Sequence, residues 1–198
     1  MVPELRNIIE TWLDESINVK QRMLTNADLI SKVEVVARKC VDACLAGNKV
    51  LLAGNGGSAA DAQHLAGEFV SRFNYDRPGL AALALTVDTS VLTAIGNDYG
   101  YEHLFARQIQ AFARSGDVFI GLSTSGNSPN VIAALEQARS MNVFTVGMTG
   151  ETGGGMRDLC DVCLCVPCTE TPRIQESHIT LGHIICGLVE HIIFPRQS

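Results

Sequence analysis

The chain has 198 residues, a formal net charge of −6, 46% hydrophobic residues and only 6% aromatic ones. This length is sufficient for one domain with a sizeable core, and the composition excludes an intrinsically disordered chain. The acidic balance argues against a general nucleic-acid-binding protein, whose surface is usually basic, but it is compatible with an anionic small-molecule substrate.

The first 47 residues carry two helical patterns. Apolar residues recur at helical spacing within 5–17 and again within 29–44, and Gly47 is expected to stop the second helix. The first segment lacks the basic start and apolar core of a secretory signal, and no apolar run reaches the roughly 18 to 20 residues of a membrane span. We therefore expect a cytoplasmic protein without membrane contact, whose first helix packs on the domain or on a partner subunit.

Apolar runs and helical patterns then alternate along the chain. The runs are Val50–Ala53, Ala81–Leu85, Val118–Leu122, Val143–Met148 and Val162–Val166. The helical patterns are Ala59–Phe73, Tyr101–Arg114, Asn130–Ser140 and a final helix from Pro172 to about Ile193, with Thr171 as its N-cap. Continuous apolar runs are typical of parallel strands covered on both faces. The sequence predicts a single α/β domain over 1–198, with 1–47 as an N-terminal helical segment and a five-stranded, mostly parallel sheet between helices.

Four of the seven cysteines lie in one segment, "CDVCLCVPC", at Cys160, Cys163, Cys165 and Cys168. Four thiolates are a typical zinc ligand set, but structural zinc sites usually place two CxxC units about a dozen or more residues apart. The segment instead resembles a short buried strand, with Cys163 and Cys165 on one face and Leu164 on the other. We favour the strand. The other three cysteines lie in helical patterns and are expected in the core: Cys40, Cys44 and Cys186.

The first predicted strand is followed by a glycine-rich loop, "GNGGS", from Gly54 to Ser58. Gly54, Gly56 and Ala59 match a dinucleotide-binding fingerprint only weakly, because the acid at Asp88 comes too late, and no lysine completes a P-loop. The glycines can also serve a tight turn alone. In either case, backbone N–H groups at the start of the next helix suit an oxygen-rich or anionic ligand.

The loop after the third predicted strand, "STSGNSPN", carries four hydroxyl groups, on Ser123, Thr124, Ser125 and Ser128. Hydroxyls, backbone N–H groups and a helix N-terminus can together hold a phosphate without a lysine. The alternative is a polar capping loop. Because ligands of parallel sheets bind outside the carboxyl ends of the strands, this position favours a phosphate site.

Two predicted helices carry candidate metal or acid–base residues. His64 and Glu68 share one helix face, and the final helix places Gln175, His178 and His183 within an otherwise apolar segment. Gln175 and His183 lie about 12 Å apart along a regular helix. They can share one ion only through long side-chain reach, a helix irregularity or contributions from different subunits. If different subunits contribute the two residues, the site lies at a subunit interface.

Four motifs in this order, "GNGGSAADAQHLAGE", "RPGLAALALTVDTSVLTAIGNDYG", "GLSTSGNSPNVI" and "RIQESHI" followed by His183, resemble the sugar isomerase (SIS) domain family, and in particular the phosphoheptose isomerases. The resemblance covers nearly the whole chain. It implies reversible aldose–ketose isomerisation of sedoheptulose 7-phosphate to D-glycero-D-manno-heptose 7-phosphate, which leads to the heptose of lipopolysaccharide cores. It also implies a homotetramer whose active sites are shared between subunits.

The resemblance further implies roles for individual residues. One zinc ion per subunit would be held by His64, Glu68, Gln175 and His183, either to polarise the sugar oxygens or to order the site. Moving a carbonyl between C1 and C2 requires proton transfer between neighbouring carbons, so we expect Glu68 to act as the base and His183 as its acid–base partner. The implied substrate contacts are Asn55, Gly56, Gly57, Ser58, Glu68, Asn97, Asp98, Ser123, Thr124, Ser125, Ser128 and Gln175.

Two other interpretations compete with the enzyme. Related SIS proteins act as non-enzymatic adaptors that bind the bacterial replication initiator, and these tend to lack the carboxylate at position 68 and the histidine at position 183. This chain has both residues, although its ending "HIIFPRQS" is similar to the adaptors. A sugar-phosphate-sensing module is disfavoured because no DNA-binding or further catalytic domain is attached.

Overall fold

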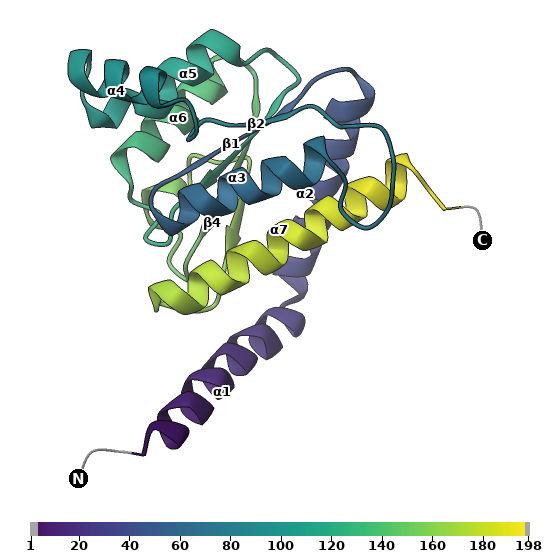
Figure 1. The fold of residues 1–198 in the computed structure, drawn as a ribbon, viewed down its shortest axis with the longest axis vertical. Helices are drawn as coiled ribbons and strands as arrows, with labels where there is room; N and C mark the ends of the chain where they lie inside the picture. Colours follow the sequence, from purple (N-terminus) through teal and green to yellow (C-terminus); the bar gives the residue numbers. More distant parts are fainter. Residues whose placement is uncertain (1–3, 197–198) are drawn as a thin grey trace.

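The computed structural model describes residues 4–196, in which five parallel strands form one sheet between two layers of helices (Figure 1). The strands are β1 (Val50–Gly54), β2 (Ala82–Ala84), β3 (Val118–Leu122), β4 (Phe144–Thr149) and β5 (Val162–Cys165), in the order β2-β1-β3-β4-β5. All four neighbouring pairs are parallel. The predicted α/β sandwich is therefore confirmed, with strand ends within two residues of those expected.

Different helices cover the two faces of the sheet. Leu52 and Ile120 belong to the core beneath three helices, α2 (Ala27–Leu45), α3 (Gly57–Val70) and α7 (Thr171–Ile193). Leu51 and Phe119 face the other way, beneath α5 (Leu104–Phe112) and α6 (Pro129–Ser140). Because successive side chains of a strand point to opposite faces and both faces are buried, the strands are continuously apolar.

The first helix, α1 (Leu5–Leu24), extends away from the body of the molecule (Figure 1). It buries only Val19 and Met23, near its carboxyl end. Most of its other large apolar side chains are more than half exposed: Leu5, Ile9, Trp12, Leu13, Ile17 and Leu24. The predicted amphipathic helix is present, and most of its apolar face has no partner within the described part of the chain.

The sequence predicted the end of α2 correctly and the start of α7 wrongly. α2 stops as expected, because Gly47 has a positive φ of 77° and donates to Cys44, while Asn48 donates to Ala43, which is the Schellman pattern. The expected N-cap at Thr171 was wrong. Thr171 is the first residue of α7, and the cap position falls on Glu170, whose side chain makes no capping bond.

One helix was not predicted at all. α4 (Thr89–Asp98) occupies a stretch for which the sequence predicted neither a helix nor a strand, and the expected helix 101–114 divides into a 3₁₀ turn (Tyr101–His103) and α5. Asp88, considered above as a ribose-binding acid, accepts a hydrogen bond from the Val91 N–H and so caps α4. No residue of α4 is fully buried, although Leu92 and Ile95 are partly buried against the core. Among residues 4–196, no helix is both long and apolar enough to cross a membrane.

Candidate functional site

The two predicted ligand loops lie at the topological switch point of the sheet. The chain leaves β1 for β2 on one side and later returns to β3 on the other side of β1. Sheets of this order bind ligands outside the carboxyl ends of the two strands at the switch. Asn55 follows β1 and Asn130 opens the helix after β3, and their carboxamides form two hydrogen bonds of 2.9 Å. The two loops are thus joined at the edge where a ligand is expected.

The loop after β1 depends on two of its glycines. Gly56 has a φ of 56° and a ψ of −122°, a conformation that disfavours any residue with a side chain. A Cβ at Gly54 would stand 2.7 Å from the Ser58 carbonyl oxygen. Ser58 itself is only 3% exposed. These contacts make the tight turn that aims the start of α3 at the switch point.

Three of the four expected hydroxyls meet at the start of α6. The Ser123 Oγ lies 2.8 Å from the Ser128 Oγ and 3.4 Å from the Ser125 Oγ. Ser128 occupies the N-cap of α6 but makes no capping bond, so its hydroxyl is bonded to Ser123 and not to the helix. Thr124 accepts the Gly150 N–H through its backbone oxygen. Clustered hydroxyls at a helix N-terminus suit an anion such as a phosphate.

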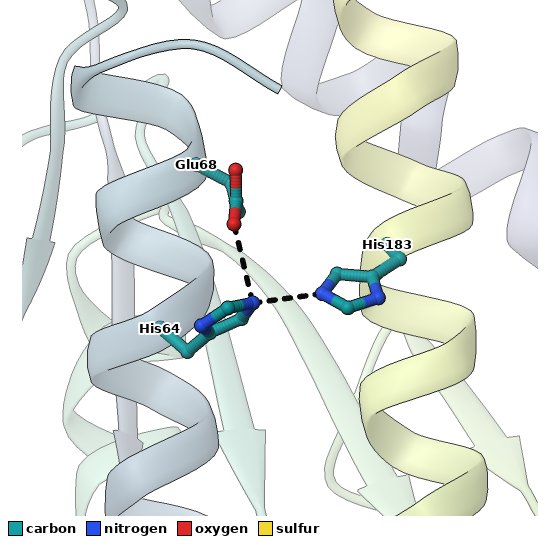
Figure 2. Close-up of side chains that lie close together, drawn as sticks. All are labelled: His64, Glu68 and His183. Atoms are coloured by element: carbon teal, nitrogen blue, oxygen red, sulfur yellow. Dashed lines mark hydrogen bonds and ion pairs between the residues drawn. The ribbon is translucent and has the colours of Figure 1, made fainter. Parts of the chain in front are cut away.

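The expected metal residues of α3 and α7 converge within one chain. The His64 Nε2 lies 3.2 Å from a Glu68 oxygen and 2.8 Å from the His183 Nε2 (Figure 2). All three candidate ligand atoms lie within 4.8 Å of one another. His64 is exposed, whereas Glu68 and His183 are half-buried, and His64 and Glu68 line a surface cleft of about 500 Å³.

Close packing of α3 on α7 brings these side chains together. A Cβ at Gly182 would stand 2.5 Å from the Leu65 side chain, so the two helices touch directly beside His183. Gln175 lies two turns earlier on the same uninterrupted helix, against Gly57. The helix irregularity that would let Gln175 and His183 approach one another is therefore not found. Gln175 and His183 can therefore share an ion only if their side chains reach far enough or if they come from different subunits.

A buried ion pair holds the end of α3 to α7. Arg77, whose side chain is 3% exposed, donates to Glu190 at 3.2 Å, and Glu190 also accepts the N–H groups of Phe73 and Asn74. The guanidinium further donates to the Glu68 carbonyl at 2.8 Å. Burial raises the pKa of Glu190, but these hydrogen bonds and the Arg77 charge outweigh it and hold the pKa below its ordinary value.

The sequence analysis missed Asp61, one turn before His64 on α3. Burial raises the pKa of its carboxyl, and the nearby His64 and His183 counter that increase only in part. Its Oδ2 is buried without a hydrogen-bond partner among the described residues. A signal was present, because Asp61 and His64 are three residues apart and share a helix face. A half-buried acid beside two imidazoles adds negative charge to this group.

Other expected residues lie elsewhere. Asn97 and Asp98 end α4 and hydrogen-bond to each other, and within residues 4–196 no hydrogen bond joins them to the loops after β1 and β3. The cysteine segment is a strand, as predicted. The sulfurs of Cys163 and Cys165 are 3.7 Å apart on one face of β5, while Leu164 enters the core on the other. In the described chain, the four cysteines of this segment do not gather around a common point as metal ligands would.

Comparison with known proteins agrees with this geometry. The family model described as the SIS domain matches residues 11–150. A phosphoheptose isomerase from Aneurinibacillus thermoaerophilus is 62% identical over 98% of each chain, and one from Burkholderia pseudomallei is 60% identical over 94% of this chain and 97% of the relative. The solved phosphoheptose isomerase of Neisseria gonorrhoeae has a TM-score of 0.89 and 42% identity, covering 94% of this chain and 99% of that one.

Proposed function

Because this chain belongs to the phosphoheptose isomerases of the SIS domain family, we propose that it interconverts sedoheptulose 7-phosphate and D-glycero-D-manno-heptose 7-phosphate. The observation that carries the proposal is the convergence of His64, Glu68 and His183 in one chain. The adaptor interpretation has no comparable support, since it uses neither the carboxylate at 68 nor the imidazole at 183.

The chemistry needs two groups that can move a proton between neighbouring carbons. Glu68 takes the carbon-bound proton, an enediol forms, and His183 exchanges protons with the sugar oxygens before the proton returns to the other carbon. The half-buried position of Glu68 and His183 supports this division of work, since partial exclusion of water strengthens interactions at the reacting atoms. Asp61 places a further carboxylate close to both imidazoles.

The same residues fit a zinc ion. Two imidazole nitrogens and a carboxylate oxygen are ligands that zinc prefers, and these candidate ligand atoms all lie within 4.8 Å of one another. His64, Glu68 and His183 would hold the ion, with Gln175 as the fourth ligand. When bound, zinc would polarise oxygens of the sugar as a Lewis acid. Glu68 and His64 share one helix face, so this part of the set needs no rearrangement of the backbone.

Substrate binding is divided between the two loops. The hydroxyls of Ser123, Ser125 and Ser128 would hold the phosphate at the start of α6, with Thr124 beside them. Asn55, with Gly56 and Gly57, would contact the sugar from the loop after β1. Asn97 and Asp98 would contribute from the end of α4. The position of both loops at one switch point supports this assignment.

The proposal also includes the assembly and its place in the cell. The whole chain 1–198 would act as one SIS domain, with 1–47 as its N-terminal helical segment, in a cytoplasmic homotetramer with shared active sites. The exposed apolar residues of α1 support assembly, as does an apolar groove of about 510 Å³ between α1, α2 and α7. Sedimentation at several protein concentrations tests this part.

The activity is tested with sedoheptulose 7-phosphate as substrate and an assay coupled to consumption of the aldose product. The unaltered chain should turn over the substrate, and Glu68→Gln should not. Binding of the purified bacterial replication initiator is measured in parallel. If the chain binds the initiator and does not turn over the substrate, it is an adaptor and not an isomerase.

A further inference from the structure

The carboxamide of Asn55 is held on three sides by its own chain. Its Nδ2 donates to the Asn130 Oδ1 at 2.9 Å, and its Oδ1 accepts from the Asn130 Nδ2 at 2.9 Å. The Tyr101 hydroxyl donates to the same Oδ1 at 3.0 Å. Asn130 is 2% exposed, so its side chain is enclosed by the protein and cannot turn freely toward solvent.

The hydrogen-bonding capacity of Asn55 is therefore almost fully used. A carboxamide oxygen has two lone pairs, and both are occupied, one by Asn130 and one by Tyr101. The nitrogen has two hydrogens, and one of them is taken by Asn130. What remains is one N–H. Asn55 can thus offer a ligand a donor but no acceptor.

Asn55 faces open space on two sides. One pocket of about 450 Å³ is lined by Asn55, Tyr101, Ser128 and Asn130, and so adjoins the serine loop. Another of about 520 Å³ is lined by Asn55, Gly56 and Tyr101 together with α4 and α5. Both pockets share Asn55 and Tyr101, so the hydrogen bond between these two side chains lies where the pockets meet.

We propose that Asn130 and Tyr101 are positioning residues, which hold Asn55 so that its single free N–H donates to an oxygen of the sugar part of the substrate. This inference rests on the proposed function for the identity of that sugar. The physical reason is preorganisation, because a donor already fixed in place loses little entropy when the ligand binds. A freely turning carboxamide would present its oxygen as often as its nitrogen.

The inference is tested by a double-mutant cycle with Asn55→Ala, Asn130→Ala and the two together. Dissociation constants are measured by calorimetry with sedoheptulose 7-phosphate and with inorganic phosphate. Losing one oriented hydrogen bond weakens binding about tenfold, so each single variant should bind the sugar phosphate about three- to tenfold more weakly. If Asn130 acts through Asn55, the double variant should bind like Asn55→Ala alone, to within about twofold.

Controls separate positioning from folding. Gln137→Ala on the same helix should leave both dissociation constants unchanged. Tyr101→Phe keeps the exposed ring and should weaken sugar-phosphate binding about threefold without loss of thermal stability. Inorganic phosphate should bind every variant as it binds the unaltered chain.

Three results would overturn the inference. These are an Asn130→Ala variant with unaltered sugar-phosphate affinity, effects that multiply in the double variant, or an equal loss of inorganic phosphate binding. Turnover is measured separately on the unaltered chain. The absence of turnover would count against the isomerase activity. The positioning role of Asn130 and Tyr101 is tested by the ratios of dissociation constants alone.

Discussion

Gln175 lies directly over Gly57, the first residue of α3, and a Cβ at position 57 would stand 2.6 Å from its Nε2. A side chain at this point would require the flexible end of Gln175 to move. Because Gly57 has an ordinary helical start and no positive φ, the requirement comes from Gln175 and not from the backbone. The glycine of the loop after β1 is thus matched to a residue on the last helix.

Gly57→Ala should move Gln175 and impair the reaction. Alanine favours a helix over glycine by about 0.5–1 kcal/mol, so the fold should persist. The ratio kcat/KM should fall about tenfold, as expected for a displaced ligand group. Gly67→Ala is the matched control, because a Cβ there meets nothing within 4 Å. It should stabilise α3 and leave kcat/KM unaltered, and an equally active Gly57→Ala would show that the position of Gln175 does not matter.

Glu68→Gln and His183→Gln should each abolish isomerisation. Removing a general base or acid typically costs about 10²- to 10⁴-fold in rate. Glu68→Gln keeps the shape of the side chain, and His183→Gln keeps a polar side chain of similar size. Turnover of sedoheptulose 7-phosphate is the measurement. Glu136→Gln and His191→Gln, both exposed, are matched controls and should remain active. Retained turnover in either site variant would refute its assigned role.

Zinc binding should depend on the imidazole of His64 and not on the thiol of Cys163. His64→Ala removes one of three converging ligand atoms, so elemental analysis after dialysis should find the metal lost. Cys163→Ser should keep it, because burial and sulfur contacts place Cys163 in the strand β5. The opposite pattern would move the metal to the cysteine segment.

Ser125→Ala and Ser128→Ala should weaken binding of the phosphate ester. Each removes a hydroxyl from the cluster at the start of α6, and each should raise the KM about tenfold with a smaller effect on kcat. The fold should tolerate Ser128→Ala, since that hydroxyl makes no capping bond. Ser140→Ala, at the far end of α6, is the control. An unaltered KM in both variants would argue that the phosphate binds elsewhere.

His178 should make stability depend on pH below neutrality. It is fully buried, its Nε2 faces the Thr149 carbonyl oxygen at 3.2 Å, and burial lowers its pKa to about 4. The unfolded chain binds this proton near pH 6.5, so the free energy of unfolding should fall between pH 6.5 and 4, by at most about 1.4 kcal/mol per pH unit. The free energy of unfolding, measured in urea at several pH values in this range, should change less with pH for His178→Gln than for the unaltered chain. An equal pH dependence of the unfolding free energy in the two proteins would mean that His178 is not held neutral.

The sequence indicated those features whose cause is local. Continuous apolar runs gave the strands, because burial on both faces leaves its mark on every residue of a run. Gly47 marked a helix end because only glycine easily adopts the conformation required there. The pairing of His64 with Glu68 followed from helical spacing alone.

Features that depend on tertiary packing were not accessible in this way. α4 has only ten residues and buries none of them fully, so its pattern is short and difficult to distinguish from a loop. The reciprocal bonds of Asn55 and Asn130 join residues on different loops, and no spacing rule relates them. Asp61 was overlooked because a lone acid on a helix is usually solvated, and only the folded chain shows its buried oxygen.

The two histidines that meet at 2.8 Å are 119 residues apart in the sequence. During synthesis the chain emerges amino terminus first, so β1, α3 and the serine loop are all made before His183 appears. Because a long loop must close before such distant residues meet, we expect these contacts to form late in folding. The residues proposed for catalysis therefore come together only when the last helix docks. Isomerase activity, measured during refolding, would report the docking of α7.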